Sequence, residues 1–123
     1  MNFKILMIVM AGGAIGSACR YFLQYFGNMA TAYLPWGTAV ANLFGSFLAG
    51  VVLAASSQLS ENFRLMIVFG FLGALTTMSS FIAESFLMAQ QGALLRLIWQ
   101  VSLGVVGCFV FLSVGYFLGR RFV

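Results

Sequence analysis

Four long apolar segments follow one another along the chain, and short polar stretches separate them. Each segment is about as long, at roughly 1.5 Å per helical residue, as the hydrocarbon core of a bilayer is thick. The pattern predicts one all-α transmembrane domain over residues 1–123 whose helices span residues 4–26, 36–57, 64–90 and 95–118. Four crossings place both termini on the same side of the membrane.

The composition indicates that lipid is the solvent around these helices. Hydrophobic residues make up 63% of the chain and charged residues only 7%. A soluble domain needs far more charge to cover its surface, so this balance is typical of a membrane protein. The net charge of +4 does not indicate a nucleic-acid partner, because the basic residues are scattered singly or as one pair and form no basic face. They are typical of anchors at the membrane edge.

The chain lacks the residue types of a catalytic centre. It has no histidine and only two acidic residues, so it contains neither an acid pair nor a nucleophile with a base. The two cysteines, Cys19 and Cys108, lie inside apolar segments and are interpreted as small packing residues. We therefore expect no enzymatic activity.

The third apolar segment carries polar residues where lipid is expected, in the stretch GFLGALTTMSSFIAE. As one straight helix, its run from Leu65 to Ala89 would measure roughly 37 Å, which exceeds the hydrocarbon thickness. Glycines weaken the helix here, and threonine and serine hydroxyls compete with its backbone hydrogen bonds. The sequence therefore predicts that the third helix is broken at its centre.

Such a break leaves main-chain groups that need new partners. Inside a membrane these groups are tolerated only where protein or a cavity supplies the partners. Freed carbonyls suit a small hard cation, and nearby hydroxyls and amides suit an anion. The polar stretch is thus a candidate ion site.

Two polar residues on the first two spans permit two interpretations each. Asn42 is the deepest member of a polar stripe with Thr38 and Ser46, and its amide either ties two helices together or lines a path. Arg20, near the predicted end of the first span, either extends to the membrane surface or supplies positive potential at the mouth of an anion path. The residues alone leave both alternatives open.

Small residues recur at four-residue spacing in three of the spans. This spacing predicts close helix packing rather than a functional site. The residues are Gly12 and Gly16, then Gly37, Ala41, Gly45 and Ala49, then Gly115 and Gly119.

Three stretches, GGAIGSACRYF, GTAVANLFGSFLAG and GFLGALTTMSSFIAE, occur in this order on the first three spans. In a chain this short, they resemble the Fluc/CrcB family of fluoride channels over essentially the whole length. The resemblance implies a dual-topology antiparallel homodimer in the cell inner membrane, with two fluoride pathways and one sodium ion at the dimer centre. The function that it implies is passive export, which lowers the cytoplasmic fluoride concentration.

The resemblance also implies roles for particular residues. The sodium ion would lie at the main-chain carbonyls of Gly73 and Thr76. The anion path would pass Asn42, Met78 and Phe81, with Thr77 and Ser80 nearby and Arg20 at a vestibule. Neutral donors suit conduction, because a lysine or arginine in the pore would hold fluoride too firmly for rapid passage.

The chain departs from the family pattern in two places. Met78 stands where the family usually has phenylalanine, so a flexible thioether replaces a ring whose edge is positive. The last span of family members typically carries a polar track, whereas here the face through Gly104, Cys108 and Leu112 is nearly apolar. Both departures predict slower passage or a somewhat different route.

Two other functions compete with this interpretation. Small multidrug exporters are also dual-topology four-helix chains, but their proton-coupled exchange needs a carboxylate in the first membrane helix, where this chain has none. A weakly conducting assembly subunit is the remaining alternative. Glu84, the only acid inside the spans, is expected to cap or orient neighbouring groups and thus to have a structural role.

Overall fold

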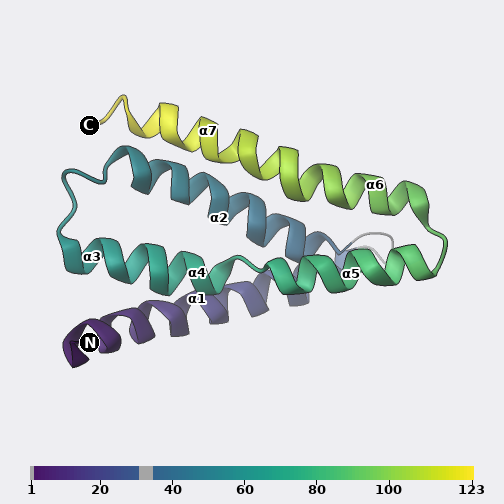
Figure 1. Ribbon diagram of the computed structural model, residues 1–123, viewed down its shortest axis with the longest axis horizontal. Coiled ribbons are helices and arrows are strands. Elements are labelled where there is room, and N and C mark those ends of the chain that lie inside the picture. Colours follow the sequence, from purple (N-terminus) through teal and green to yellow (C-terminus); the bar gives the residue numbers. More distant parts are fainter. Residues whose placement is uncertain (1, 31–34) are drawn as a thin grey trace.

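Apolar length decides the architecture, because each of the four apolar segments forms a helix long enough to cross a membrane. The structure, a computed structural model, describes residues 2–30 and 35–123. The first two spans are the single helices α1 (Phe3–Ala30) and α2 (Trp36–Ala54). The third span contains α3 (Glu61–Leu65), the π-helical segment η1 (Met66–Leu72), α4 (Gly73–Leu75) and α5 (Met78–Gln90). The fourth contains α6 (Leu94–Ser102), the π-helical segment η2 (Leu103–Gly107) and α7 (Cys108–Gly119) (Figure 1).

The number and order of the membrane-length helices agree with the prediction, and their ends differ from it by up to a few residues. α1 continues to Ala30, so Arg20 lies well inside the helix rather than near its end. α2 ends at Ala54, before the predicted end, because the chain enters a turn in which the Ser56 N–H donates to the Leu53 carbonyl (3.4 Å). The predicted connection between the first two spans includes residues 31–34, which lie outside the described residues.

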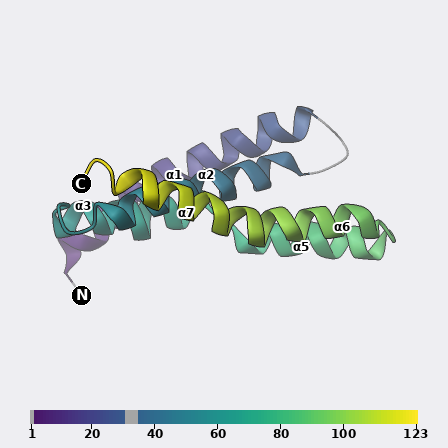
Figure 2. The same ribbon diagram turned by 90° about the horizontal axis from the view of Figure 1, so that it is seen from above.

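Both termini lie at the same end of the molecule, as the sequence predicts (Figure 1). In that view α2 lies between the third and fourth spans, and α1 crosses the half of the third span that contains α3 and α4. The opposite end is more open, since Figure 2 shows α1 and α2 diverging there from α5 and α6. The helices therefore pack most closely at the end that carries the termini.

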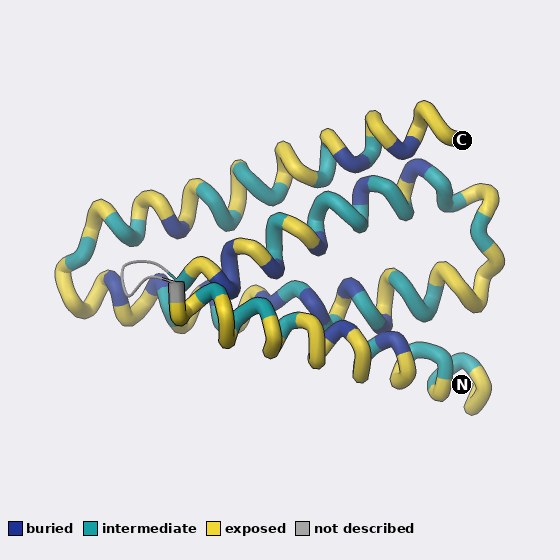
Figure 3. Tube along the Cα trace, turned by 180° about the vertical axis from the view of Figure 1, so that it is seen from behind, coloured by how far each residue is buried: buried dark blue, intermediate teal, exposed yellow. Residues whose placement is uncertain are grey.

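Large apolar side chains cover the outside of the four helices. Tyr21, Phe22, Phe109 and Phe117 are among those that are exposed. Exposed residues follow α1 and the fourth span along their whole length (Figure 3). Membrane-spanning helices present apolar side chains to lipid, so this apolar surface and the four spans are those of a multi-pass membrane protein.

Glycines bring the helices into backbone contact at the end with the termini. A Cβ atom at Gly12 would overlap the Met66 carbonyl oxygen, and one at Gly50 would overlap that of Leu112. The first contact joins α1 to η1, and the second joins α2 to α7. The predicted packing role of the small residues is confirmed, since neighbouring spans also leave no room for a side chain at Gly16, Gly45, Gly115 and Gly119.

The third span is broken at its centre, as the sequence predicts. Thr76 has φ −81° and ψ 151°, and Thr77 has φ −147° and ψ 110°. Both residues are therefore extended, and the helix resumes only at Met78. This two-residue interruption lies between α4 and α5.

Candidate functional site

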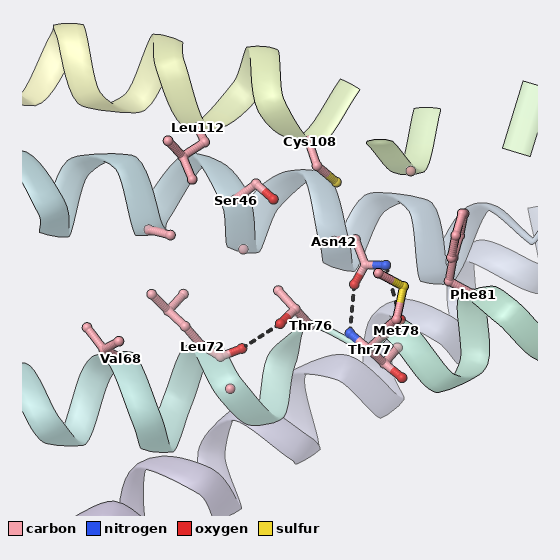
Figure 4. Close-up of a pocket in the computed structure, with 14 residues that line it drawn as sticks. Asn42, Ser46, Val68, Leu72, Thr76, Thr77, Met78, Phe81, Cys108 and Leu112 are labelled. Atoms are coloured by element: carbon pink, nitrogen blue, oxygen red, sulfur yellow. Dashed lines mark hydrogen bonds between the residues drawn. The ribbon is translucent and has the colours of Figure 1, made fainter. Parts of the chain in front are cut away.

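The side chain of Asn42, on α2, holds the break in place. Its Oδ1 accepts a hydrogen bond from the Thr77 N–H (2.7 Å), and its Nδ2 donates to the Thr77 carbonyl (3.2 Å) (Figure 4). One amide thus replaces both of the hydrogen bonds that Thr77 would make in an unbroken helix. The interhelical tie that the sequence left open for Asn42 is present, and it joins α2 to the third span.

The carbonyls of Gly73 and Thr76 are among those that lose their helical donors at the break. In an unbroken helix, the Thr77 N–H would bond the Gly73 carbonyl and the Ser80 N–H would bond the Thr76 carbonyl. Here the Thr77 N–H bonds Asn42, and the Ser80 N–H donates to the Thr77 hydroxyl (3.2 Å). The two carbonyls that the resemblance assigns to a cation are therefore deprived of their helical donors.

Thr77 is the N-cap of α5, and its hydroxyl bonds within the break. Besides accepting from the Ser80 N–H, it donates to the Ser80 hydroxyl (3.1 Å). Only 6% of Thr77 is exposed. The Thr76 hydroxyl is also engaged, since it donates to the Leu72 carbonyl (2.9 Å). These hydroxyls consequently stabilise the local conformation of the break.

An open cavity of about 410 Å³ lies over the break. Its lining combines amide and hydroxyl groups with apolar side chains from the second, third and fourth spans (Figure 4). The residues that both line it and were assigned to ions from the sequence are Asn42, Gly73, Thr76, Thr77, Met78 and Phe81. The structure thus brings the two assigned cation ligands and four of the six residues assigned to the anion path into one cavity, whereas Ser80 and Arg20 do not line it.

The side of the cavity formed by the fourth span is apolar, as the sequence predicts. Gly104, Cys108 and Leu112 line it. The Ser113 hydroxyl, one residue further along, donates instead to the Phe109 carbonyl of its own helix (2.9 Å). Among the described lining residues, the hydroxyl and amide donors therefore come from α2 and the third span.

Met78 and Phe81 have different environments although they are one turn apart on α5. Met78 is 68% exposed, whereas Phe81 is 7% exposed. Both project from α5 near Asn42 (Figure 4). The Phe81 ring is thus packed inside this chain, while the Met78 thioether lies on its surface.

Glu84 accepts hydrogen bonds from two other spans. Thr38 Oγ1 donates to one carboxylate oxygen (2.6 Å), and Gln100 Nε2 donates to the other (3.0 Å). Gln24 Nε2 donates in turn to Thr38 Oγ1 (3.1 Å). This Glu84 cluster takes one side chain from each span. These hydrogen bonds are of the kind that an orienting role for Glu84 requires, and the N-cap of α5 is Thr77. The expectation that Glu84 caps or orients neighbouring groups stays a prediction.

The sequence did not indicate that Gln24 and Gln100 belong to this cluster. Thr38 is fully buried, and Gln100 is 3% exposed. The only feature of the sequence that could have indicated Gln24 and Gln100 is their polarity inside apolar spans, because a polar side chain there costs free energy unless it has a partner. Which partner each of them has depends on the packing of all four spans.

Arg20 lies outside the cavity. It is half-buried on α1, whereas the described lining residues come from the other three spans. Ser80 does not line the cavity, but it is hydrogen-bonded to Thr77, which does. A vestibule position for Arg20 stays a prediction.

The comparison with known proteins agrees with the motifs in the spans. The family model described as "CrcB-like protein, Camphor Resistance (CrcB)" matches residues 7–116. A protein of Leptospira interrogans named "Fluoride-specific ion channel FluC" is 42% identical, and the match covers 99% of this chain and 100% of the relative. Proteins of the same name are 38% identical in Pseudomonas syringae pv. maculicola, over 91% of each chain, and 36% identical in Methanococcus aeolicus, over 91% of this chain and 92% of the relative.

The family match covers the second and third spans and nearly all of the first and fourth. The break, the Asn42 tie and the cavity all lie within the matched residues. The chain belongs to the CrcB-like family.

Proposed function

We propose that this protein is a fluoride-selective channel that lowers cytoplasmic fluoride by passive export across the cell inner membrane. The observation that carries the proposal is the cavity over the break. Among its described lining residues, the polar groups are neutral: the Asn42 amide, hydroxyls and main-chain groups. The names of the relatives supply the identity of the ion.

Neutral donors suit a channel for a small, strongly hydrated anion. The pore must replace the water around the ion, yet release it quickly, and a lysine or arginine would bind it too firmly. The Asn42 amide nitrogen carries two hydrogens, of which the Thr77 carbonyl uses one. We assign the second hydrogen to the anion, together with the positive edge of the Phe81 ring.

We further propose that two copies form an antiparallel, dual-topology dimer around one structural sodium ion. In a single chain Gly73 is exposed. The N–H groups that would bond the Gly73 and Thr76 carbonyls in an unbroken helix donate to side chains instead. Two-fold symmetry doubles these two carbonyls into four oxygens, and a sodium ion among them offsets the cost of carbonyls without amide partners.

Anomalous scattering from a heavier monovalent cation in crystals of the dimer tests the sodium site. The expected peak lies on the two-fold axis between the Gly73–Thr76 segments. Because the ligands are main-chain atoms, Thr76→Ser keeps the peak, whereas Ala74→Pro changes the local backbone and removes it. Water with tetrahedral oxygen contacts at that point would contradict the proposal.

A proton-coupled exporter is the alternative from another class. Such an exporter needs a carboxylate in the first membrane helix, and α1 contains neither aspartate nor glutamate. Glu84 lies in the third span, where both of its oxygens accept hydrogen bonds. A weakly conducting assembly subunit is favoured only by the exposed Met78 thioether and the apolar face of the fourth span.

Growth of cells that lack their own fluoride channel separates these functions. Expression of this chain should restore growth in fluoride and leave sensitivity to toxic cationic dyes unchanged. Resistance to the dyes without resistance to fluoride would support the exporter instead. Resistance to fluoride only when a second, conducting homologue is supplied would support the assembly subunit.

A further inference from the structure

Gly104, at the start of the fourth span's π-helical segment η2, lies directly against the ring of Phe81. A Cβ atom at position 104 would overlap Cε2 of that ring and would lie only 2.7 Å from Cζ and 3.0 Å from Cδ2. Both residues line the cavity over the break. The ring therefore occupies space that the side chain of any other residue at position 104 would need.

This contact differs from the glycine contacts at which two backbones meet, and among the glycines that meet side chains Gly104 is the one that lies against an aromatic ring. At Gly12, Gly16, Gly50 and Gly115 the nearest atom is a main-chain oxygen of a neighbouring helix, so a side chain there would push two backbones apart. At Gly104 the three nearest atoms all belong to the end of one side chain. A methyl group at Gly104 would therefore move the ring and leave the helices in place.

The contact also determines how the ring faces the cavity. The three nearest atoms, Cδ2, Cε2 and Cζ, are contiguous, so one side of the ring is turned to Gly104 and the Cδ1–Cε1 side is turned away from it. Phe81 is only 7% exposed, and the Ser85 hydroxyl donates to its carbonyl (2.7 Å). The backbone and one side of the ring are thus both fixed.

We infer that Gly104 is a positioning residue for anion passage, because the missing side chain sets the orientation of the Phe81 ring in the path. An anion contacts an aromatic ring favourably at its edge and unfavourably at its face. A tilted ring would turn part of its negative face toward the ion. This inference rests on the proposed function, since it assigns Phe81 to the fluoride path.

The test compares Gly104→Ala with Gly107→Ala, which lies in the same π-helical segment. A Cβ at Gly107 meets only the ends of two leucine side chains, Leu43 Cδ2 at 3.0 Å and Leu103 Cδ2 at 3.9 Å. Fluoride efflux from liposomes is measured for the parent protein and for both variants. In parallel, the ¹³C–¹H ring resonances of Phe81 are recorded by NMR and assigned by their loss in Phe81→Leu.

Gly104→Ala should remain folded, shift the Phe81 ring resonances and reduce fluoride efflux by about ten-fold, which corresponds to about 1.4 kcal/mol. Gly107→Ala should change neither the resonances nor the efflux. Equal efflux from Gly104→Ala and the parent protein would overturn the inference, whether or not the ring resonances shift. A Gly104→Ala chain that does not fold would also overturn it, because the contact would then support the helices. Absence of fluoride efflux from the parent protein would instead contradict the proposed function itself.

Discussion

The two halves of the third span are held to their neighbours by different kinds of contact, although Gly27 and Gly37 keep α1 and α2 in backbone contact at the open end as well. At the end with the termini, Gly12 and Gly50 let α1 and α2 touch the backbones of η1 and α7. Beyond the break, α5 and α6 diverge from α1 and α2 (Figure 2), and the Glu84 cluster joins all four spans through side-chain hydrogen bonds. The break lies between these two regions.

This difference separates the rigid part of the site from the adjustable part. Backbone contacts through glycine cannot adapt to a larger residue, so they fix the position of η1 and of the Gly73 and Thr76 carbonyls that follow it. Hydrogen bonds between side chains can lengthen or exchange partners at a modest cost, which averages about 0.6 kcal/mol in one membrane protein. We therefore expect the proposed cation site to be rigid and the side of the cavity formed by α5 to tolerate more change.

The largest effect on stability should come from substitutions at the glycine contacts. Gly12→Ala places a methyl group on the Met66 carbonyl oxygen and should lower the free energy of unfolding by about 3 kcal/mol. The adjacent Gly13→Ala is the control, because its nearest neighbour, the Gly70 carbonyl oxygen, is 3.9 Å away. Its effect should stay within about 1 kcal/mol. Unfolding in detergent measures both, and similar values for the two variants would show that α1 and η1 are not held by this contact.

The Glu84 cluster should have the next largest effect. Glu84→Ala leaves the Thr38 hydroxyl and the Gln100 amide, both buried, without their acceptor, and should cost about 2 kcal/mol. The matched control is Glu61→Ala, at an exposed acid in the first turn of α3, which should cost less than about 1 kcal/mol. Thermal unfolding of the purified variants compares them. If Glu84→Ala and Glu61→Ala lower the stability equally, the Glu84 cluster contributes no specific stability to the open end.

Asn42 should affect passage more than stability. Asn42→Leu removes both hydrogen bonds to Thr77 and should cost up to about 2 kcal/mol, while fluoride efflux falls to the background of empty liposomes because the amide donor is lost. The dimer should remain assembled, which cross-linking or light scattering would show. Asn62→Leu, at an exposed amide on α3, should conduct normally. Normal efflux from Asn42→Leu would leave Asn42 with only its role as an interhelical tie.

The smallest effect on stability should come from Met78. Because Met78 is 68% exposed, Met78→Phe should change the free energy of unfolding by less than about 0.5 kcal/mol. It restores an aromatic edge beside Phe81 and should raise fluoride efflux by a few-fold. Met10→Phe, at an exposed methionine of α1, serves as the control and should leave efflux unchanged. A decrease in efflux with Met78→Phe would indicate that the Met78 thioether itself supports fluoride passage in this chain.

The sequence was sufficient for the features that depend on local composition. Apolar length predicted the four spans to within a few residues. The crowding of Gly70, Gly73, Thr76 and Thr77 predicted the break, because these residues weaken a helix wherever it lies. The shared end of the two termini followed from the number of spans.

Features that depend on partners from other spans could not be predicted in the same way. The Glu84 cluster joins residues that are 16 and 46 positions apart in the chain, and no local pattern pairs them. The reciprocal bonds between Asn42 and Thr77 and the position of Phe81 against Gly104 likewise depend on how the spans pack. The π-helical segments were also not predicted, since no residue type in η1 or η2 requires them.

The central claim is that the neutral groups over the break of the third span conduct fluoride and exclude chloride. Efflux from liposomes that contain the purified protein tests it most directly, with ion-selective electrodes for both ions and the concentration gradient as the only driving force. The account predicts rapid fluoride release, chloride release no faster than from empty liposomes, and loss of the fluoride signal with Asn42→Leu. Equal release of the two ions, or of neither, would contradict it.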